Sequence, residues 1–279
     1  MMNIDDFIKL ALAEDIGAGD YTSLSCIPSE AFGKAKLLVK DNGIAAGVEL
    51  AQMIFHHVDP ALQSTVFIND GETIKYGDVI LHVEGPSRSI VTAERLMLNC
   101  TQRMSGIATL TSKYVDQLSG LNTKLLDTRK TTPLFRQIEK WAVRIGGGQN
   151  HRFGLFDMMM IKDNHVDYSG GIKQAIIKAN EYLKKNELTL KIEIETRSFK
   201  EVQEVLDVGN IDRIMLDNFS IPDLQEAVKI INGTFETEAS GGITIDNIRT
   251  YATTGVDFIS CGAITHSAPN LDLSLKAFN

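Results

Sequence analysis

The sequence has 279 residues, of which 43% are hydrophobic, and its formal net charge is −8 with a pI near 5.3. This length is enough to bury one large core, or a barrel-sized core with a smaller domain attached. The acidic balance argues against broad nucleic-acid binding, which needs a large basic surface, and no run approaches the roughly 18 apolar residues of a membrane span.

Cysteine usage and the first residues bear on the cellular compartment. Cys26, Cys100 and Cys261 are widely spaced and form neither a CxxC pair nor a disulfide framework. The segment Met1–Asp6 lacks the basic and apolar regions of a signal peptide. We therefore expect a reducing environment and a cytoplasmic protein.

The first 110 residues combine short helical and β-like patterns. Apolar residues recur at helical intervals over residues 5–13, 48–57 and 89–111. Thr92 is placed to cap the third of these helices. Short β-like runs bounded by turn signals lie at residues 34–39, 43–46, 65–68 and 79–83. These patterns predict an N-terminal α+β sandwich domain over residues 1–110.

From about residue 123 onward, β-like runs alternate with helical patterns. The six β-like runs are at residues 124–127, 158–161, 190–195, 213–217, 234–239 and 258–261. Helical patterns lie between most of them, at residues 171–185, 199–208, 222–231 and 245–253. Such alternation predicts a parallel sheet, and six strands in ~140 residues indicate a closed or nearly closed α/β barrel of six or seven strands. An open doubly wound sheet is the alternative.

Polar or glycine residues follow each of the six β-like runs. In α/β barrels the loops at the carboxyl ends of the strands build the active site, so these six segments are predicted to meet at one mouth. The segments are Thr128-Arg129-Lys130, Lys162-Asp163-Asn164, Glu195-Thr196, Asp217-Asn218, Ser240-Gly241-Gly242 and Gly262-Ala263.

A cationic stretch runs through the middle of this acidic chain. Between Arg129 and Lys162 seven basic side chains stand against two acidic ones, a local net charge of +5. The glycines Gly146-Gly147-Gly148 interrupt it, and a glycine backbone can approach a ligand closely. Clustered Arg and Lys bind carboxylates and phosphates. The stretch therefore predicts a pocket for a polyanionic small molecule.

The remaining strand ends predict metal and phosphate chemistry. Glu195 and Asp217, at successive strand ends, suit ribose hydroxyls or Mg²⁺, which prefers oxygen ligands and bridges to phosphates. A glycosidase carboxylate pair is the rival use, but a neutral sugar needs no cationic surroundings. Zinc is disfavoured because the histidines show no HExxH spacing. The loops at Ser240-Gly241-Gly242 and Gly262 are candidates for a sugar phosphate, with His266 as a further donor.

Three segments of the sequence resemble the signature segments of the quinolinate phosphoribosyltransferase family, also named nicotinate-nucleotide pyrophosphorylase. They are Asp127-Thr-Arg-Lys-Thr-Thr-Pro133, Gly146-Gly-Gly-Gln-Asn-His-Arg152 and Ile161-Lys-Asp-Asn-His165, and the resemblance extends over nearly the whole chain. It implies an enzyme of NAD biosynthesis. In the implied reaction quinolinate and phosphoribosyl pyrophosphate give nicotinate mononucleotide, pyrophosphate and carbon dioxide.

The resemblance also implies the roles of individual residues. The catalytic set would be Lys130, Lys162, Glu195 and Asp217, with Glu195 and Asp217 facing the ribose and Mg²⁺. The quinolinate carboxylates would be held by Arg129, His151 and Arg152. The phosphate-binding loops would contain Ser240, Gly241, Gly262 and His266.

The family's assembly and domain division are further implications. The resemblance implies a homodimer or a higher oligomer in which Arg95 reaches the active site of the neighbouring subunit. It also implies that residues 266–279 pack back on the first domain, which leaves a catalytic barrel over residues 111–265. No nucleic acid or membrane partner is implied.

Two alternatives stay open at this point. One is a molybdenum-transport-associated relative with the same fold and a different substrate, although the set Arg129, Arg152 and Lys162 favours quinolinate. The other is a non-catalytic protein that binds phosphoribosyl or pyridine-dicarboxylate anions. Glu195 and Asp217 speak against pure anion capture, which gains nothing from two carboxylates.

Overall fold

The computed structural model describes residues 3–278, which divide into two compact units. Within this range the first unit holds the residues up to 110, residues 137–146 and those from 268 onward, and the second holds residues 111–136 and 147–267. Residues 137–146 therefore belong with the first unit, whereas the sequence analysis placed them in the second domain. Their Glu139 is fully buried and pairs with Arg103 at 2.8 Å, which accounts for the difference.

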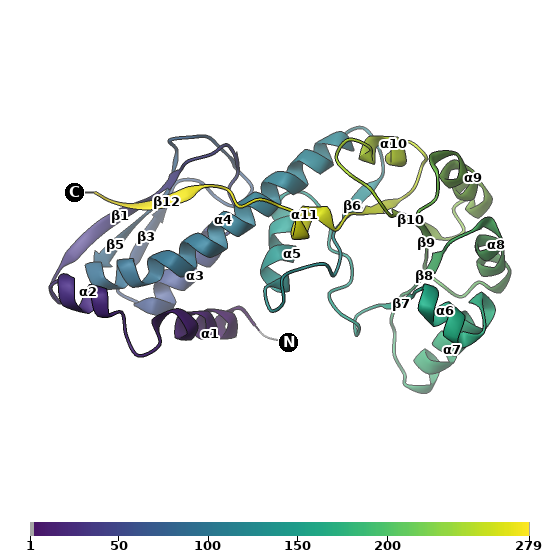
Figure 1. Cartoon of the computed structure of the whole chain (residues 1–279), viewed down its shortest axis with the longest axis horizontal. Helices are drawn as coiled ribbons and strands as arrows, with labels where there is room; N and C mark the ends of the chain where they lie inside the picture. The colour runs from purple at the N-terminus through teal and green to yellow at the C-terminus, as the bar shows by residue number, and fades with distance from the viewer. Residues whose placement is uncertain (1–2, 279) are drawn as a thin grey trace. The chain divides into compact units, whose positions relative to one another are not determined.

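The first unit is built on an antiparallel sheet in the order β12-β1-β5-β3 (Figure 1). The strands are β1 (Phe32–Val39), β3 (Gln63–Val66), β5 (Val79–Pro86) and β12 (Leu273–Phe278), and a small second sheet pairs β2 (Gly43–Ile44) with β4 (Thr73–Ile74). The C-terminal strand β12 pairs with β1 along its length, from Lys34↔Phe278 to Val39↔Leu273. Residues 273–278 thus belong to the same sheet as residues 32–39.

Five helices accompany this sheet among the described residues, α1 (Ile4–Ile16), α2 (Tyr21–Cys26), α3 (Val48–Val58), α4 (Ser87–Gln117) and α5 (Arg136–Ile145). The prediction that Thr92 caps a helix is wrong, because β5 runs directly into α4 and the helix begins at Ser87. Thr92 lies inside α4 and donates a hydrogen bond to Asp20 at 3.1 Å. Within residues 3–278 no helix, α4 included, has both the length and the apolarity to cross a membrane.

The second unit contains a parallel sheet of six strands in the order β6-β11-β10-β9-β8-β7. The strands are β6 (Lys124–Leu126), β7 (Met159–Ile161), β8 (Ile192–Thr196), β9 (Arg213–Asp217), β10 (Glu236–Ser240) and β11 (Phe258–Ser260). The predicted α/β class and six parallel strands are confirmed. In the described part of the chain β6 and β7 are the sheet's two edges, so the barrel is open rather than closed by hydrogen bonds.

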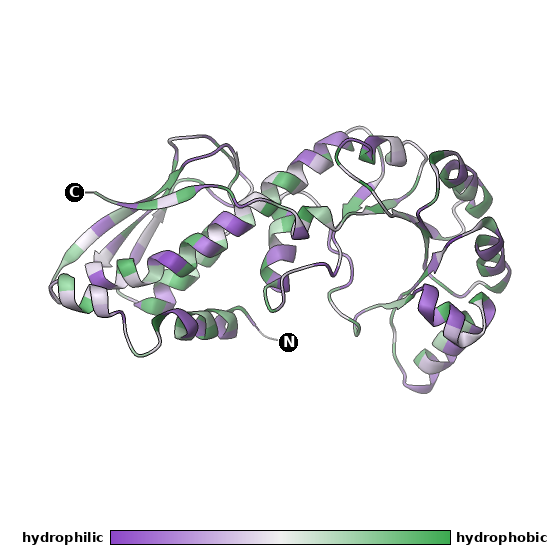
Figure 2. Cartoon of the chain, viewed as in Figure 1, coloured by the Kyte–Doolittle hydropathy of each residue, from purple (hydrophilic) through white to green (hydrophobic). Residues whose placement is uncertain are grey.

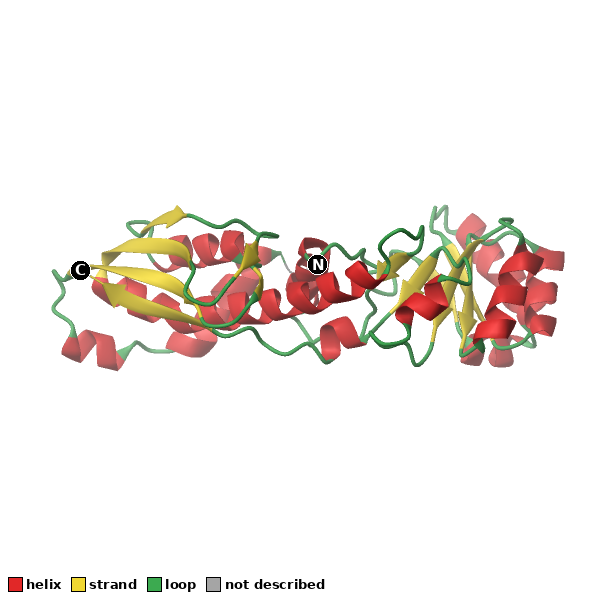
Figure 3. Ribbon diagram, turned by 90° about the horizontal axis from the view of Figure 1, so that it is seen from above, coloured by secondary structure: helices red, strands yellow, loops and turns green. Residues whose placement is uncertain are grey.

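The second unit contains the helices α6 (Asp163–Ser169), α7 (Ile172–Lys185), α8 (Phe199–Val208), α9 (Ile221–Ile231), α10 (Ile248–Ala252) and α11 (Ala263–His266). Of these, α7, α8 and α9 lie along the outer side of the curved sheet (Figures 1 and 3). Each carries both hydrophobic and hydrophilic residues, as expected for helices with one buried face (Figure 2). The side chains on the inner side of the sheet come from the strands themselves.

Local sequence explains where two of these helices begin. Ser198 precedes α8 and its side chain accepts a hydrogen bond from the amide of Glu201, and Ser220 does the same for Asp223 at the start of α9. Such caps satisfy amides that have no partner inside the helix. Helix α9 starts one residue before Pro222, which needs no amide hydrogen bond in the first turn.

Candidate active site

A cavity of about 680 Å³ lies at the carboxyl ends of the six parallel strands of the second unit. All six strand ends contribute to it, as the sequence predicts. The structure brings eleven of the twelve predicted site residues to this cavity: Arg129, Lys130, His151, Arg152, Lys162, Glu195, Asp217, Ser240, Gly241, Gly262 and His266. The twelfth, Arg95, is exposed on α4 in the first unit.

Not all of the cationic stretch reaches the cavity. Arg129, Lys130, Arg152 and Lys162 line it, whereas its three other basic residues lie in α5, Arg136, Lys140 and Arg144. Arg136 instead joins two loops, since its guanidinium donates to the carbonyl of Phe153 at 2.9 Å and to the hydroxyl of Thr131 at 2.9 Å. These loops carry Arg129 and Arg152.

Arg129 and Arg152 form the most cationic part of the cavity wall. Burial of Arg152 lowers its pKa, and repulsion from Arg129 lowers it further. Two guanidinium groups close enough to repel one another are stabilised by an anion placed between them. This part of the wall is suited to a carboxylate or phosphate group.

The next strand ends place a cation against an acid. Lys162 Nζ lies 2.9 Å from the carboxylate of Glu195, which is 9% exposed at the end of β8. The amide of Lys162 donates to His165 Nδ1 at 2.9 Å. His165 therefore shapes the backbone at the start of α6, which orients the lysine toward Glu195.

Asp217 is held in place by its neighbour Asn218. The Asn218 side-chain amide donates to the Asp217 carboxylate at 2.6 Å, and its backbone amide donates to the Ser240 carbonyl at 2.9 Å. A Cβ at Gly241 would lie 2.2 Å from the side-chain oxygen Oδ1 of Asn218, and Gly241 has a φ of +101°. Only glycine fits this position, so the backbone after β10 closes tightly onto the end of β9.

Gly262 has a similar role after β11. A Cβ there would lie 2.9 Å from Lys130 Cδ and 3.1 Å from His266 Cδ2. The hydroxyl of Thr265 also donates to the carbonyl of Lys130 at 2.8 Å. Lys130 and His266 are thus packed on the same glycine, on the side of the cavity formed by the two late loops.

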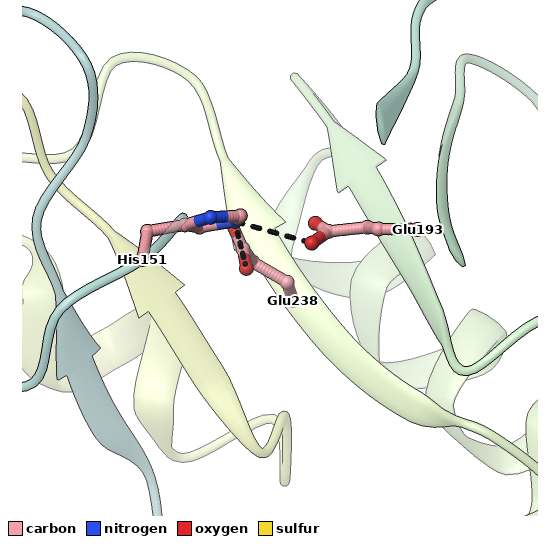
Figure 4. A group of neighbouring side chains, drawn as sticks. All are labelled: His151, Glu193 and Glu238. Carbon is pink, nitrogen blue, oxygen red and sulfur yellow. Dashed lines mark ion pairs between the residues drawn. The ribbon is translucent and has the colours of Figure 1, made fainter. Parts of the chain in front are cut away.

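Below the cavity mouth, His151, Glu193, Glu238 and Arg213 form a buried cluster, of which Figure 4 shows the first three. His151 Nε2 lies 3.1 Å from Glu193 and 3.3 Å from Glu238, and the Arg213 guanidinium lies 3.0 Å from Glu238. Glu193 and Glu238 have no exposed surface, and His151 is 8% exposed. The strands supply three of the four residues, since Glu193 on β8 and Arg213 on β9 are register partners and Glu238 lies on β10.

The pKa values of the cluster are set by burial and mutual charge. Burial raises the pKa of Glu193 to about 7, with repulsion from Glu238 adding to it. For Glu238, burial is outweighed by His151 and Arg213, which lower its pKa. Burial alone would lower the pKa of His151, but the two glutamates raise it to about 9.

A hydrogen bond from the main chain opposes that protonation of His151. The amide of Arg152 donates to His151 Nδ1 at 2.7 Å, so this nitrogen carries no proton of its own. A second proton on the ring would have to sit there, facing another N–H. We therefore describe His151 as the neutral imidazole with its proton on Nε2, directed at the two glutamates.

Sequence reasoning missed Glu193, Arg213 and Glu238 of this cluster. A signal was present: charged residues occur at alternate positions within otherwise apolar strands, as in Ile192-Glu193-Ile194-Glu195. Alternate strand residues share one face, so Glu193 had to lie on the same side of the sheet as Glu195. The pairing of strands, which the sequence does not give, was needed to place Arg213 beside it.

Comparison with known proteins gives the class and then the family. The N-terminal domain model of quinolinate phosphoribosyl transferase matches residues 20–105, and the C-terminal domain model matches residues 107–276. The chain is 49% identical to the chloroplastic nicotinate-nucleotide pyrophosphorylase [carboxylating] of Arabidopsis thaliana, over 96% of this chain and 81% of the relative.

Solved structures agree with these matches. NadC from Streptococcus pyogenes is 37% identical with a TM-score of 0.93, over 99% of this chain and 97% of that one. The nicotinate-nucleotide pyrophosphorylase from Francisella tularensis is 39% identical with a TM-score of 0.91, over 99% and 96%.

Fold and site therefore define a phosphoribosyl-transferring enzyme with its cavity at the end of a parallel α/β sheet. The chain belongs to the quinolinate phosphoribosyltransferase family. The predicted family and the predicted decarboxylating activity in NAD biosynthesis are confirmed. The molybdenum-associated relative and the non-catalytic anion-binding protein are accordingly set aside.

Proposed function

We propose that the cavity holds quinolinate and phosphoribosyl pyrophosphate side by side. Arg129, His151 and Arg152 bind the quinolinate carboxylates, while the loops at Ser240-Gly241 and Gly262, together with His266, bind the sugar phosphate. The observation that carries this proposal is that one cavity of about 680 Å³ is lined both by two arginines, whose charges repel one another, and by two glycine loops. A diacid and a sugar phosphate need both walls.

The reaction follows from this placement. The pyridine nitrogen attacks the anomeric carbon of the ribose, and pyrophosphate leaves with the electrons of the broken C–O bond. The C–C bond to the 2-carboxylate then breaks, carbon dioxide leaves, and the electron pair that remains on the ring carbon takes up a proton. The positively charged ring nitrogen stabilises that electron pair, so the protein acts chiefly by positioning and electrostatics.

Lys130 and Lys162 are proposed to lie beside the reacting groups. Lys162 lies 2.9 Å from one carboxylate oxygen of Glu195, and the second oxygen can accept a hydrogen bond from a ribose hydroxyl. Lys130 packs on Gly262, between the carboxylate wall and the phosphate loops. Both lysines can therefore neutralise negative charge that develops as pyrophosphate departs.

We also propose that Glu195 and Asp217 hold Mg²⁺ with its phosphate ligands. The two residues fit this ion because they end adjacent strands, line the same cavity and offer carboxylate oxygens. When bound, Mg²⁺ neutralises charge on the pyrophosphate oxygens. Asp217→Asn is expected to raise the Mg²⁺ concentration needed for half-maximal activity about tenfold or more, in line with the loss of one charged ligand.

The assembly is proposed to be a homodimer, or a higher oligomer, in which Arg95 serves the neighbouring subunit. Arg95 is exposed on α4, and so is Val91 one turn earlier, at 45% exposure. An exposed apolar residue next to an exposed arginine is a common feature of protein interfaces. Analytical ultracentrifugation tests the assembly. Mixing Arg95→Ala with an inactive Lys130→Ala variant should restore part of the activity if the arginine acts across subunits.

The domain boundaries and the cellular compartment of the protein are also proposed. We propose a catalytic domain of residues 111–265, of which residues 137–146 pack with the first unit, and an N-terminal domain of residues 1–110 joined by residues 266–279. We propose a cytoplasmic location, supported by the three cysteines Cys26, Cys100 and Cys261, all of which are free. Fractionation of cells that contain the protein tests this, and recovery in an organelle fraction would contradict it.

The activity is tested directly with quinolinate labelled in its 2-carboxyl group. Purified protein, phosphoribosyl pyrophosphate and Mg²⁺ should release labelled carbon dioxide and form nicotinate mononucleotide in equal amounts. Label in the 3-carboxyl group should stay in the nucleotide. Absence of product with phosphoribosyl pyrophosphate still bound would refute the activity for this chain.

A further inference from the structure

Arg129 and Arg152 stand on irregular segments of the chain rather than on the strands. Residues 127–135 and 150–158 are neither helix nor strand, and we call these two segments the arginine loops. Both lie in the second unit. The charges of Arg129 and Arg152 repel one another, which favours a larger separation of the loops. The cross-links between the loops therefore decide how far apart the two guanidinium groups lie.

Asp127 provides the first cross-link, at the start of both arginine loops. Its fully buried carboxylate accepts from the side-chain amide of Asn150 at 2.7 Å and from the main-chain amide of His151 at 2.8 Å. Its own amide donates to the carbonyl of Gln149 at 3.1 Å. The loops are thus joined just before each of them reaches its arginine.

Arg136, the first residue of α5, provides a second cross-link after both arginines. Its Nε donates to the Thr131 hydroxyl at 2.9 Å, and its Nη2 donates to the Arg129 carbonyl at a longer 3.5 Å. Its Nη1 donates to the Phe153 carbonyl at 2.9 Å, and the guanidinium lies 5.8 Å from the centroid of the Phe153 ring. One planar group with several donors therefore spans both loops.

The loop that carries Arg152 is also closed by its own acid. The carboxylate of Asp157 accepts from the amide of Phe153 at 2.6 Å and from the amide of Gly154 at 2.8 Å. Phe153 is thus held through its amide by Asp157 and through its carbonyl by Arg136. Because Phe153 directly follows Arg152, these bonds fix the main chain beside the cavity arginine.

Arg136 does not line the cavity, unlike Arg129 and Arg152. It can influence a bound anion in two ways, through its positive charge at a distance or through the spacing of the two loops. A lysine would keep the charge, but its single nitrogen on a flexible stem would not span both loops. The two roles are therefore separable by experiment.

We propose that Arg136 is a positioning residue, which fixes the separation of Arg129 and Arg152 and so makes the cavity selective for two carboxylates on neighbouring ring carbons. This inference rests on the proposed quinolinate site and deepens it. Two guanidinium groups held at one spacing gain most from a ligand whose own charges are fixed at a matching spacing. A ligand with a single carboxylate gains little from that spacing.

Two aromatic acids test this selectivity without turnover. Phthalate has the two neighbouring carboxylates of quinolinate but no ring nitrogen, and benzoate has one carboxylate. Ligand-observed NMR titration measures the Kd of each, including weak binding. We expect wild type to bind phthalate at least about tenfold more tightly than benzoate, since a second charged contact contributes about that factor. Equal affinity of wild type for the two acids would overturn the proposal.

Arg136→Met removes every donor of the cross-link, and Arg136→Lys keeps only the charge. Positioning predicts that the preference for phthalate falls about tenfold in both variants, while the Kd for benzoate changes less than about threefold. A lysine variant with the wild-type preference would show that the charge alone matters, and equal losses for both acids would show general damage to the site. Either result would overturn the proposal.

Thr131→Val is a milder variant that keeps the proposal testable if the Arg136 variants do not fold. It removes the acceptor of Arg136 Nε, and the preference for phthalate should fall about threefold, as expected for one hydrogen bond. An unchanged preference in this variant would contradict the proposed cross-link.

Arg249 offers a matched control in the same unit. Its guanidinium also contacts two main-chain carbonyls, those of Gln117 at 2.6 Å and Ser119 at 3.3 Å, but it does not line the cavity. Arg249→Met and Arg249→Lys should keep the wild-type preference for phthalate. A tenfold loss in these variants would mean that any broken arginine bridge has this effect, and the proposal would fail.

Steady-state kinetics extends the test to the substrates. In Arg136→Met the KM for quinolinate should rise about tenfold, while the KM for phosphoribosyl pyrophosphate changes less than about twofold. Equal changes in the two KM values would contradict a role confined to the carboxylate site. An inactive wild type would refute the proposed function, and the titration with phthalate and benzoate would still decide the role of Arg136.

Discussion

The two larger sheets of the described residues bury very different side chains. In β1 of the antiparallel sheet Ala35, Leu37 and Val39 alternate with more exposed residues, as expected for a sheet with one covered face. In the parallel sheet every residue of β8 is buried, and the inner face includes Glu193 and Glu195. The first arrangement is explained by apolar burial alone. In the parallel sheet, burial of charged groups lowers the stability of the fold, so function is the more plausible reason for their presence.

The largest effect on activity is expected when a charged side chain is removed from the cavity at the end of the parallel sheet. Arg152→Ala should lower kcat/KM about a hundredfold or more, because loss of a buried charged contact costs roughly 2–5 kcal/mol. The melting temperature should change little, because the substitution also removes the repulsion between Arg152 and Arg129. Steady-state kinetics with quinolinate measures the effect. Lys200→Ala, on the exposed outer helix α8, is the control and should behave as wild type.

Breaking the ion pair at the end of β8 should have the next largest effect. Lys162→Ala is expected to lower kcat more than it raises either KM, by about a hundredfold, because the lysine is placed to act on charge that develops during the reaction. Single-turnover measurements separate this effect from substrate binding. A change in the KM for quinolinate alone would assign Lys162 to binding only.

A core substitution in the first unit should show the reverse behaviour. Leu37 has no exposed surface, and Leu37→Ala should lower the free energy of unfolding by about 2–5 kcal/mol. Activity per folded molecule, measured well below the melting temperature, should stay within about twofold, because no charged group has moved. Thermal melts and assays on the same sample decide this. A hundredfold loss of activity in folded protein would remove the distinction between the two sheets.

The smallest effect is expected at a helix cap of the first unit. Asp20 accepts hydrogen bonds from the hydroxyl and amide of Ser23, which lower its pKa below 3.8. A lowered pKa contributes stability above the unfolded-state value, and this contribution is lost as pH falls through the folded-state value. Asp20→Asn should therefore melt about 1–3 °C below wild type at pH 7, and the gap should close below pH 4. A gap that widens in acid would contradict the assignment.

Much of the fold could be predicted from sequence because the signals are local. The six parallel strands coincide with apolar runs in the sequence. Two of the helices between them begin directly after the capping serines Ser198 and Ser220. The start of α4 could not be predicted in the same way. Thr92 is a good capping residue, but the turn that begins α4 is fixed by the end of β5 rather than by a local cap.

The residues of the site also fall into those that sequence could predict and those that it could not. Residues at strand ends, such as Lys162 and Asp217, could be predicted because all parallel strands deliver their carboxyl ends to one side. The cluster under the cavity could not, because it depends on register: Glu193 meets Arg213 only through the pairing of β8 with β9. The net charge of the segment 129–162 was also an incomplete guide, since Lys140 is buried in α5 instead of lining the cavity.

The most direct test of the account is a crystal structure with phthalate and 5-phosphoribose bound. We predict the phthalate carboxylates within hydrogen-bond distance of Arg129, His151 and Arg152, and the phosphate at Ser240, Gly241 and Gly262. Phthalate bound elsewhere, or phosphate at the Arg129 wall and carboxylates at the glycine loops, would contradict the arrangement on which the proposed reaction rests.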